Sequence, residues 1–80
     1  MNLDQAIEQM KAKIKTASAS AVIKVVKISG EEARLSVYAP GGEIQTIKEA
    51  CFQPTMDFLT QHNLDVQVFP YDIATTPPPD

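Results

Sequence analysis

The chain has 80 residues, of which 44% are hydrophobic and 21% are charged, and this composition predicts one small folded domain. Its single cysteine excludes an intramolecular disulfide and a multi-cysteine metal cage, and no apolar run reaches the ~20 residues that span a bilayer. The net charge is −3, and charged residues occur throughout residues 1–19, where a signal peptide would be apolar. We therefore expect a soluble cytoplasmic protein without membrane attachment.

The first predicted element is an amphipathic helix over residues 3–16. Asn2 is expected to cap its N-terminus, with Gln5 three residues later completing a capping box. Four apolar residues recur at helical spacing and form one stripe, namely Leu3, Ile7, Met10 and Ile14.

Two strands follow, joined by a hairpin connection at residues 30–32. The first, residues 21–30, is the most apolar, and we expect it at the centre of the sheet, antiparallel to both neighbours. Its adjacent Val25 and Val26 break the alternation, which indicates either a strand covered on most sides or a bulge near Val25. The second, residues 33–39, alternates cleanly: Ala33, Leu35, Val37 and Ala39 are expected to be buried, and Arg34, Ser36 and Tyr38 to face solvent.

A second helix is predicted over residues 43–61, after the turn at residues 40–42. Pro54 interrupts it, so that the helix either kinks there or splits in two. Asn63 is expected to end it in a left-handed conformation. The side chains expected on its buried side are Ile44, Ile47, Cys51, Phe58 and Leu59.

A third strand is predicted from residue 64, with Leu64, Val66 and Val68 inward, and Pro70 either ends it or marks it as an edge strand. The predicted fold class is α+β in the order α-β-β-α-β. The crossover helix makes the second and third strands parallel in a three-stranded mixed sheet, with the helices on one face. Residues 1–73 are expected to form this single domain, and residues 74–80 a flexible proline-rich tail.

If Pro54 splits the second helix, the order becomes α-β-β-α-α-β, which resembles the type II KH domains that bind nucleic acid. Their Gly-x-x-Gly loop is replaced here by residues 52–55, Phe-Gln-Pro-Thr. The element order is also similar to that of iron–sulfur cluster scaffold domains. Their Cys-x-x-Cys is replaced by residues 38–42, so this resemblance implies a fold without a cluster.

The turn at residues 40–43 is a candidate anion site, because glycines before a helix can direct N–H groups at a phosphate. Gly41 and Gly42 would provide those groups. Glu43, however, already occupies the first turn and would repel a phosphate, and the Lys and Ser or Thr of a phosphate loop are missing. The turn is therefore expected to serve the fold.

No enzyme signature is present in the sequence. Cys51 and His62 would stand ~16 Å apart along an unbroken helix, too far to act as a nucleophile and its base. We therefore expect no catalysis, no metal and no cofactor. The favoured function is a protein-interaction or dimerisation module whose partner is another protein or a second copy. Its expected contact residues are Arg34, Tyr38, Phe69 and Tyr71.

The alternative function is nucleic-acid binding by the lysines of the N-terminal part. Residues 1–30 carry five lysines against two carboxylates, a net charge of +3, whereas the rest of the chain is acidic. This alternative would use Lys11, Lys15, Lys24 and Lys27. The overall negative charge and the lack of interleaved aromatic residues make nucleic acid the less favoured partner.

Overall fold

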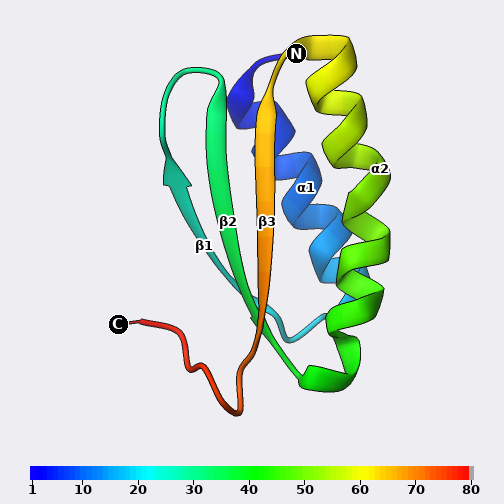
Figure 1. Ribbon diagram of the computed structural model, residues 1–80, viewed down its shortest axis with the longest axis vertical. Helices are drawn as coiled ribbons and strands as arrows, with labels where there is room; N and C mark the ends of the chain where they lie inside the picture. Colours follow the sequence, from blue (N-terminus) through cyan, green and yellow to red (C-terminus); the bar gives the residue numbers. More distant parts are fainter. Residues whose placement is uncertain (80) are drawn as a thin grey trace.

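The computed structural model describes residues 1–79, and it has two helices and a three-stranded mixed sheet (Figure 1). In chain order these are α1 (Leu3–Ala17), β1 (Val22–Lys27), β2 (Glu32–Ala39), the short 3-10 helix η1 (Gly41–Glu43), α2 (Ile44–His62) and β3 (Asp65–Asp72). The predicted α+β class and the order α-β-β-α-β are thus confirmed. No helix among the described residues is long and apolar enough to cross a membrane.

Helix α1 begins where its sequence predicts. The Asn2 side chain accepts a hydrogen bond from the Gln5 amide at 2.9 Å, and the Gln5 side chain accepts one from the Asn2 amide at 3.0 Å. This capping box satisfies two N–H groups that the helix itself cannot pair. The predicted stripe of α1 lies in the core together with Ala6.

The sheet order is β1-β2-β3, so the expectation that the first strand lies at the centre was wrong. Strand β2 is central, antiparallel to β1 and parallel to β3, and the predicted parallel pairing of the second and third strands is confirmed. The high apolar content of β1 was a poor guide to its position, because its apolar residues are divided between the two faces of the sheet. In β2 they lie on the helix-facing side, and the four residues predicted to be buried there are buried: Ala33, Leu35, Val37 and Ala39.

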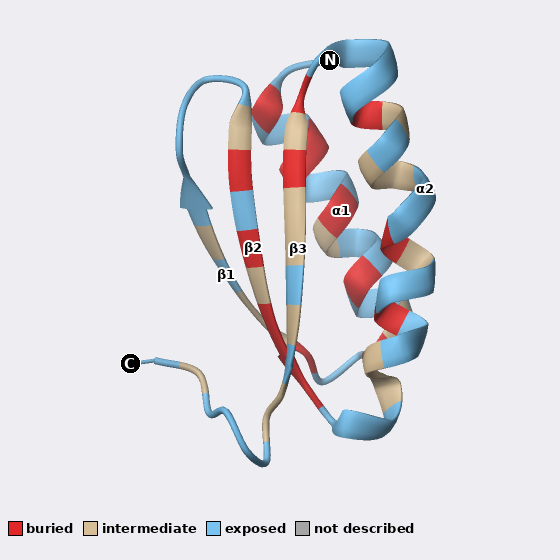
Figure 2. Ribbon diagram, in the orientation of Figure 1, coloured by how far each residue is buried: buried red, intermediate tan, exposed pale blue. Residues whose placement is uncertain are grey.

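Strand β1 pairs with β2 without a bulge, from Val22 opposite Tyr38 to Lys27 opposite Ala33. It is also exposed along much of its length (Figure 2). Neither explanation for the adjacent valines therefore holds. Val25 packs against the core, whereas Val26 projects from the opposite face and is exposed, because the helices cover only the other side of the sheet.

Helix α2 continues through Pro54 as one element, so the split that would give the KH-like order does not occur. Asn63 ends the helix in the left-handed conformation, as predicted, with φ 55° and ψ 36°. Leu59 was wrongly expected to be buried and is 44% exposed. Adjacent helical positions point ~100° apart, and Phe58 occupies the core-facing one.

Strand β3 extends through Pro70 to Asp72 at the other edge of the sheet. The amides of Asp65 and Ile73 donate to β2 or the residue before it, so the odd-numbered residues face β2 and Pro70 points to the free edge. A residue without an N–H is tolerated at such a position. Pro70 thus marks an edge without ending the strand. Residues 74–79 follow without helix or strand, and Asp80, the last residue of the expected tail, lies outside the described residues.

Candidate interaction surface

The face of the sheet turned away from the helices, here called the open face, carries four rows of side chains. In Figure 1 helix α1 lies behind the sheet, so the open face is turned toward the viewer. The strand register aligns one residue of each strand in three of the rows, and Ile28, the residue after β1, completes the fourth. Beginning at the β1–β2 hairpin, the rows are Ile28–Glu32–Asp65, Val26–Arg34–Gln67, Lys24–Ser36–Phe69 and Val22–Tyr38–Tyr71.

Large apolar side chains are exposed at the centre of this face. Val26 and Ile28 are 55% and 47% exposed, and Phe69 and Tyr71 are 40% and 38% exposed. Together with Arg34 and Ser36 they line one shallow depression of about 380 Å³. Isolated exposed apolar residues are ordinary, whereas a contiguous group of them is a candidate interaction surface.

Tyr38 lies on the open face as its alternation predicts, yet it is only 7% exposed. Its ring stacks on that of Tyr71, with centroids 5.4 Å apart and planes inclined by 22°. The expectation that Tyr38 is exposed was therefore wrong, because the parallel pairing of β2 with β3 places Tyr71 directly beside it. Stacked rings of this kind hold each other in place, so Tyr71 presents a rigid edge to solvent.

The four expected contact residues, Arg34, Tyr38, Phe69 and Tyr71, all lie on the open face. Sequence reasoning missed Val26 and Ile28, which stand beside Arg34 and Ser36 in the same depression. The usable signal was the period-two pattern of β1, in which residues 22, 24, 26 and 28 share one face. Placing β1 at the centre of the sheet concealed that signal.

One end of the open face is acidic. The Gln67 amide donates hydrogen bonds to Glu32 Oε2 and Asp65 Oδ2, both at 3.0 Å, and so holds the two carboxylates next to each other. Arg34 lies one row further along, and Lys24 lies two rows further along. The open face therefore combines balanced charges with an apolar centre, and the two charges are separated along the strands.

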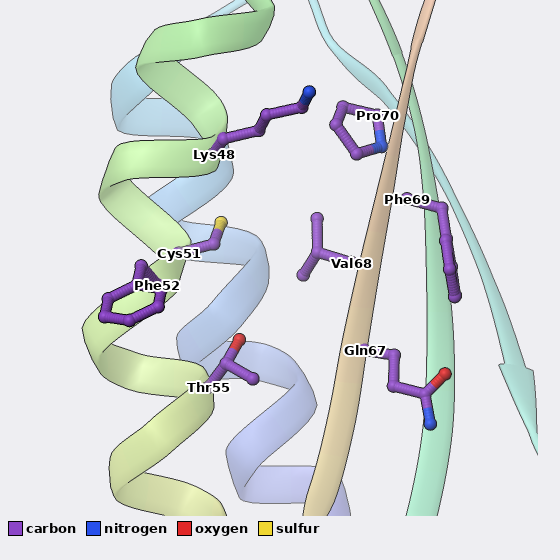
Figure 3. A pocket seen from close by; sticks show the side chains of 8 residues that line it. All are labelled: Lys48, Cys51, Phe52, Thr55, Gln67, Val68, Phe69 and Pro70. Carbon is purple, nitrogen blue, oxygen red and sulfur yellow. The ribbon is translucent and has the colours of Figure 1, made fainter.

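A second hollow, of about 400 Å³, lies between α2 and β3 (Figure 3). Cys51 and Val68 point toward each other across it, and the Lys48 amine extends toward Pro70. Phe52 points away from β3 and belongs to an exposed apolar stripe on the outer side of α2 with Met56 and Leu59.

Cys51 is a buried thiol at the base of this hollow. Burial raises its pKa above the ordinary value by desolvating the thiolate, which disfavours the nucleophilic form. His62 is the last residue of the same unbroken helix, eleven residues further on. A straight helix separates the two by ~16 Å, so the structure does not bring them together as a nucleophile and base.

The four lysines of the nucleic-acid alternative are distributed around β1 instead of forming one flat patch. Lys11 and Lys15 lie on α1 beside the strand, whereas Lys24 lies on the open face. Lys27 forms an ion pair with Asp4 on the helix-facing side. Lys11 pairs with Glu8 at 3.6 Å.

The turn with Gly41 and Gly42 is flanked by carboxylates. Glu43 accepts a hydrogen bond from the Ser18 hydroxyl at 2.7 Å, and the Asp72 carboxylate lies directly against Gly41. Both charges would repel an anion at this turn. Neither glycine has a positive φ, so the turn does not use the conformational freedom of glycine. Gly41 instead leaves room for Asp72.

The two glycines are expected to respond differently to alanine. A Cβ at Gly41 would lie 2.5 Å from Asp72 Oδ2, whereas a Cβ at Gly42 meets no atom within 4 Å. Gly41→Ala displaces a carboxylate whose other oxygen accepts the Ala74 amide at 2.9 Å, and should lower stability by about 1 kcal/mol. Gly42→Ala should raise it by ~0.5 kcal/mol, because it restricts the unfolded chain. Urea unfolding of both variants checks this; equal effects would contradict it.

Comparisons of the chain with protein-family models, with curated proteins and with solved structures found no significant match. Among residues 1–79, no three His, Cys, Asp or Glu side chains are grouped so that they could hold a metal ion. The geometry of the open face is therefore the main guide to function.

Proposed function

We propose that this chain is a non-catalytic interaction module that associates with a second copy of itself through the open face of its sheet. The observation that carries the proposal is the contiguous exposure of Val26, Ile28, Phe69 and Tyr71 opposite the helix layer. Covering these side chains removes apolar surface from water, which is the main favourable term in protein association.

The two edges of the sheet are less suited to self-association. Strand β1 carries Lys24 and Lys27, so that pairing two β1 edges would bring four lysines into one narrow region. Strand β3 carries Pro70, which lacks an edge N–H, and α2 packs alongside. Both edges thus have features that oppose pairing with a second copy. The open face has no such feature and is the better surface for self-association.

The charges of the open face favour one way of stacking two copies. If the strands of the copies run in the same direction, rotation about an axis along β2 places Glu32 on Glu32 and Arg34 on Arg34. If they run antiparallel, the acidic row faces the tyrosine row, where the phenol of Tyr71 can donate to Asp65 of the partner. The antiparallel arrangement avoids like-charge contacts and is therefore the one proposed.

The size of the face sets the strength of the dimer. A face three strands wide and eight residues long measures about 14 by 26 Å, roughly 400 Å². A standard stable interface covers about 800 Å² on each partner. The proposed dimer is accordingly weak and reversible, with a dissociation constant on the order of 10–100 micromolar.

Sedimentation equilibrium tests the dimer and its surface. Phe69→Ser should weaken self-association by at least ~10-fold, because the two-fold arrangement loses the buried ring twice. Phe52→Ser is the matched control, since Phe52 is exposed on the outer side of α2 and should leave the dissociation constant unchanged.

A wild-type chain that remains strictly monomeric at high micromolar concentration would contradict the dimer. An equal loss of association in Phe52→Ser would instead place the interface on α2.

A further inference from the structure

The outer edge of β1 presents backbone groups that point away from the sheet. The Ile28 amide donates to the Glu32 carbonyl at 2.9 Å, which identifies the hydrogen-bonded pairs of this antiparallel ladder. Such pairs alternate along the strand, so the even-numbered residues of β1 bond to β2. Ile23, Val25 and Lys27 therefore direct their N–H and C=O groups to the free edge. Figure 1 shows β1 as the outermost strand.

A groove runs along this edge on the side of α1. It measures about 570 Å³, and its lining comes from two turns of α1 and the start of β1: Glu8, Lys11, Ala12, Lys15, Ala21, Val22 and Ile23. The Lys15 amine donates to the carbonyl of Ala21 at the beginning of the outward-pointing row. An edge carbonyl is thus already paired with a cation.

Positive charge borders the edge on both sides. Lys11 and Lys15 stand on the groove side, and Lys24 stands on the open face. Lys27 lies near the end of the strand, paired with Asp4. Counting these four lysines against Asp4 and Glu8, the border of the edge carries a net charge of +2, although the whole chain is negative.

We propose that the β1 edge binds an acidic, extended peptide segment of another protein, which adds to the sheet as a fourth strand. The outward groups of Ile23, Val25 and Lys27 form the ladder with the peptide backbone. Successive side chains of an added strand point to opposite faces. Acidic side chains on one face would meet Lys11 and Lys15, and those on the other would meet Lys24. Strand addition of this kind obtains affinity from the backbone and specificity from the flanking side chains.

The same lysines select the occupant. A second copy of β1 would bring a second set of lysines to an edge that is already positive, which is electrostatically unfavourable. A nucleic acid would satisfy the lysines and the N–H groups but would leave the edge carbonyls facing phosphate oxygens, and no aromatic residue lines the groove for base stacking. An acidic peptide can pair with both the N–H and the C=O groups of the β1 edge, and its charge is opposite to that of the bordering lysines. This surface overlaps the proposed dimer face only at Val22 and Lys24.

The test uses a fluorescein-labelled peptide of about ten residues in which pairs of glutamates alternate with pairs of valines, so that both faces of the added strand carry acidic side chains. The protein is the Phe69→Ser variant, so that self-association does not affect the measurement. Fluorescence anisotropy should report binding that weakens as salt increases. In NMR spectra, the amides of Ile23, Val25 and Lys27 should become protected from hydrogen exchange. These amides are chosen because they report the ladder itself.

Two matched comparisons separate the ladder from simple charge attraction. A peptide of the same sequence, N-methylated at alternate residues, keeps its charge but cannot complete the ladder on one edge, and should bind at least ~10-fold more weakly. Lys24→Glu should weaken binding of the parent peptide by roughly 10-fold. Lys48→Glu makes the same charge change beside Pro70, across the sheet from β1, and should leave the affinity nearly unchanged.

The proposal is overturned if the peptide does not bind at low salt, or if peptides methylated on either edge bind as tightly as the parent. It is also overturned if a thymidine oligonucleotide of similar length binds more tightly and loses the same affinity with Lys24→Glu, which would identify the surface as a phosphate site. None of these results would change the sedimentation behaviour of the wild-type chain, so the dimer proposal stands or fails independently.

Discussion

Leu35→Ala is expected to lower the free energy of unfolding by about 3 kcal/mol, within the 2–5 kcal/mol range for emptying a buried leucine site. Leu35 lies at the middle of the central strand β2, is fully buried and packs into the core formed by both helices and the sheet. A chain of 80 residues has about 4–12 kcal/mol of stability in total. The substitution should therefore remove a large share of it. Urea unfolding followed by circular dichroism measures the change.

Leu59→Ala is the matched control for that experiment, because it makes the same chemical change at a leucine that is 44% exposed. It should lower the free energy of unfolding by less than ~1 kcal/mol, because the removed side chain buries little apolar surface in the folded protein and its loss leaves no enclosed cavity. If both leucines cost the same, Leu59 must be covered in solution, and the outer side of α2 would then be an interface.

Pro54→Ala is expected to raise the free energy of unfolding by about 2 kcal/mol. Pro54 lies inside the continuous helix α2 and cannot donate to the carbonyl of Ala50 one turn earlier. Alanine restores this donor and removes the steric conflict of the ring, a combined gain of about 3 kcal/mol. The loss of the proline's restriction on the unfolded chain offsets about 0.4–1 kcal/mol of that gain.

Thr46→Ala provides the comparison for Pro54→Ala, because Thr46 is an exposed residue of the same helix. A β-branched residue replaced by alanine at such a position should gain only ~0.5 kcal/mol, from helix propensity alone. Pro54→Ala should exceed this gain in urea unfolding. A Pro54→Ala variant that is no more stable than the parent would indicate that α2 is interrupted at Pro54 in solution.

The local elements were the most predictable part of this fold. The capping box of Asn2 and Gln5, the left-handed end at Asn63 and the alternation in β2 each depend on neighbours within a few residues. Their hydrogen bonds and side-chain directions follow from spacing along the chain. The parallel relation of β2 and β3 was also predictable, because a crossover helix joins them.

The candidate surface was predictable only in part. Arg34, Phe69 and Tyr71 were identified from residue type and alternation, and the register brings them to one face. Val26 and Ile28 were missed because their strand was assigned to the wrong place in the sheet. The orientation of Val26 is a local property, but whether it faces solvent depends on what lies beside and above β1.

The sequence by itself determined the order α-β-β-α-β, the starts and ends of its helices and the alternating faces of its strands, because these depend on short-range sterics and hydrogen bonds. Only the tertiary structure decided that β2 is central, that Tyr38 is covered by Tyr71, that Leu59 remains exposed and that α2 passes through Pro54. Each of these depends on which segments distant in the chain compete for the same core surface. The outcome of that competition cannot be derived from any single stretch of sequence.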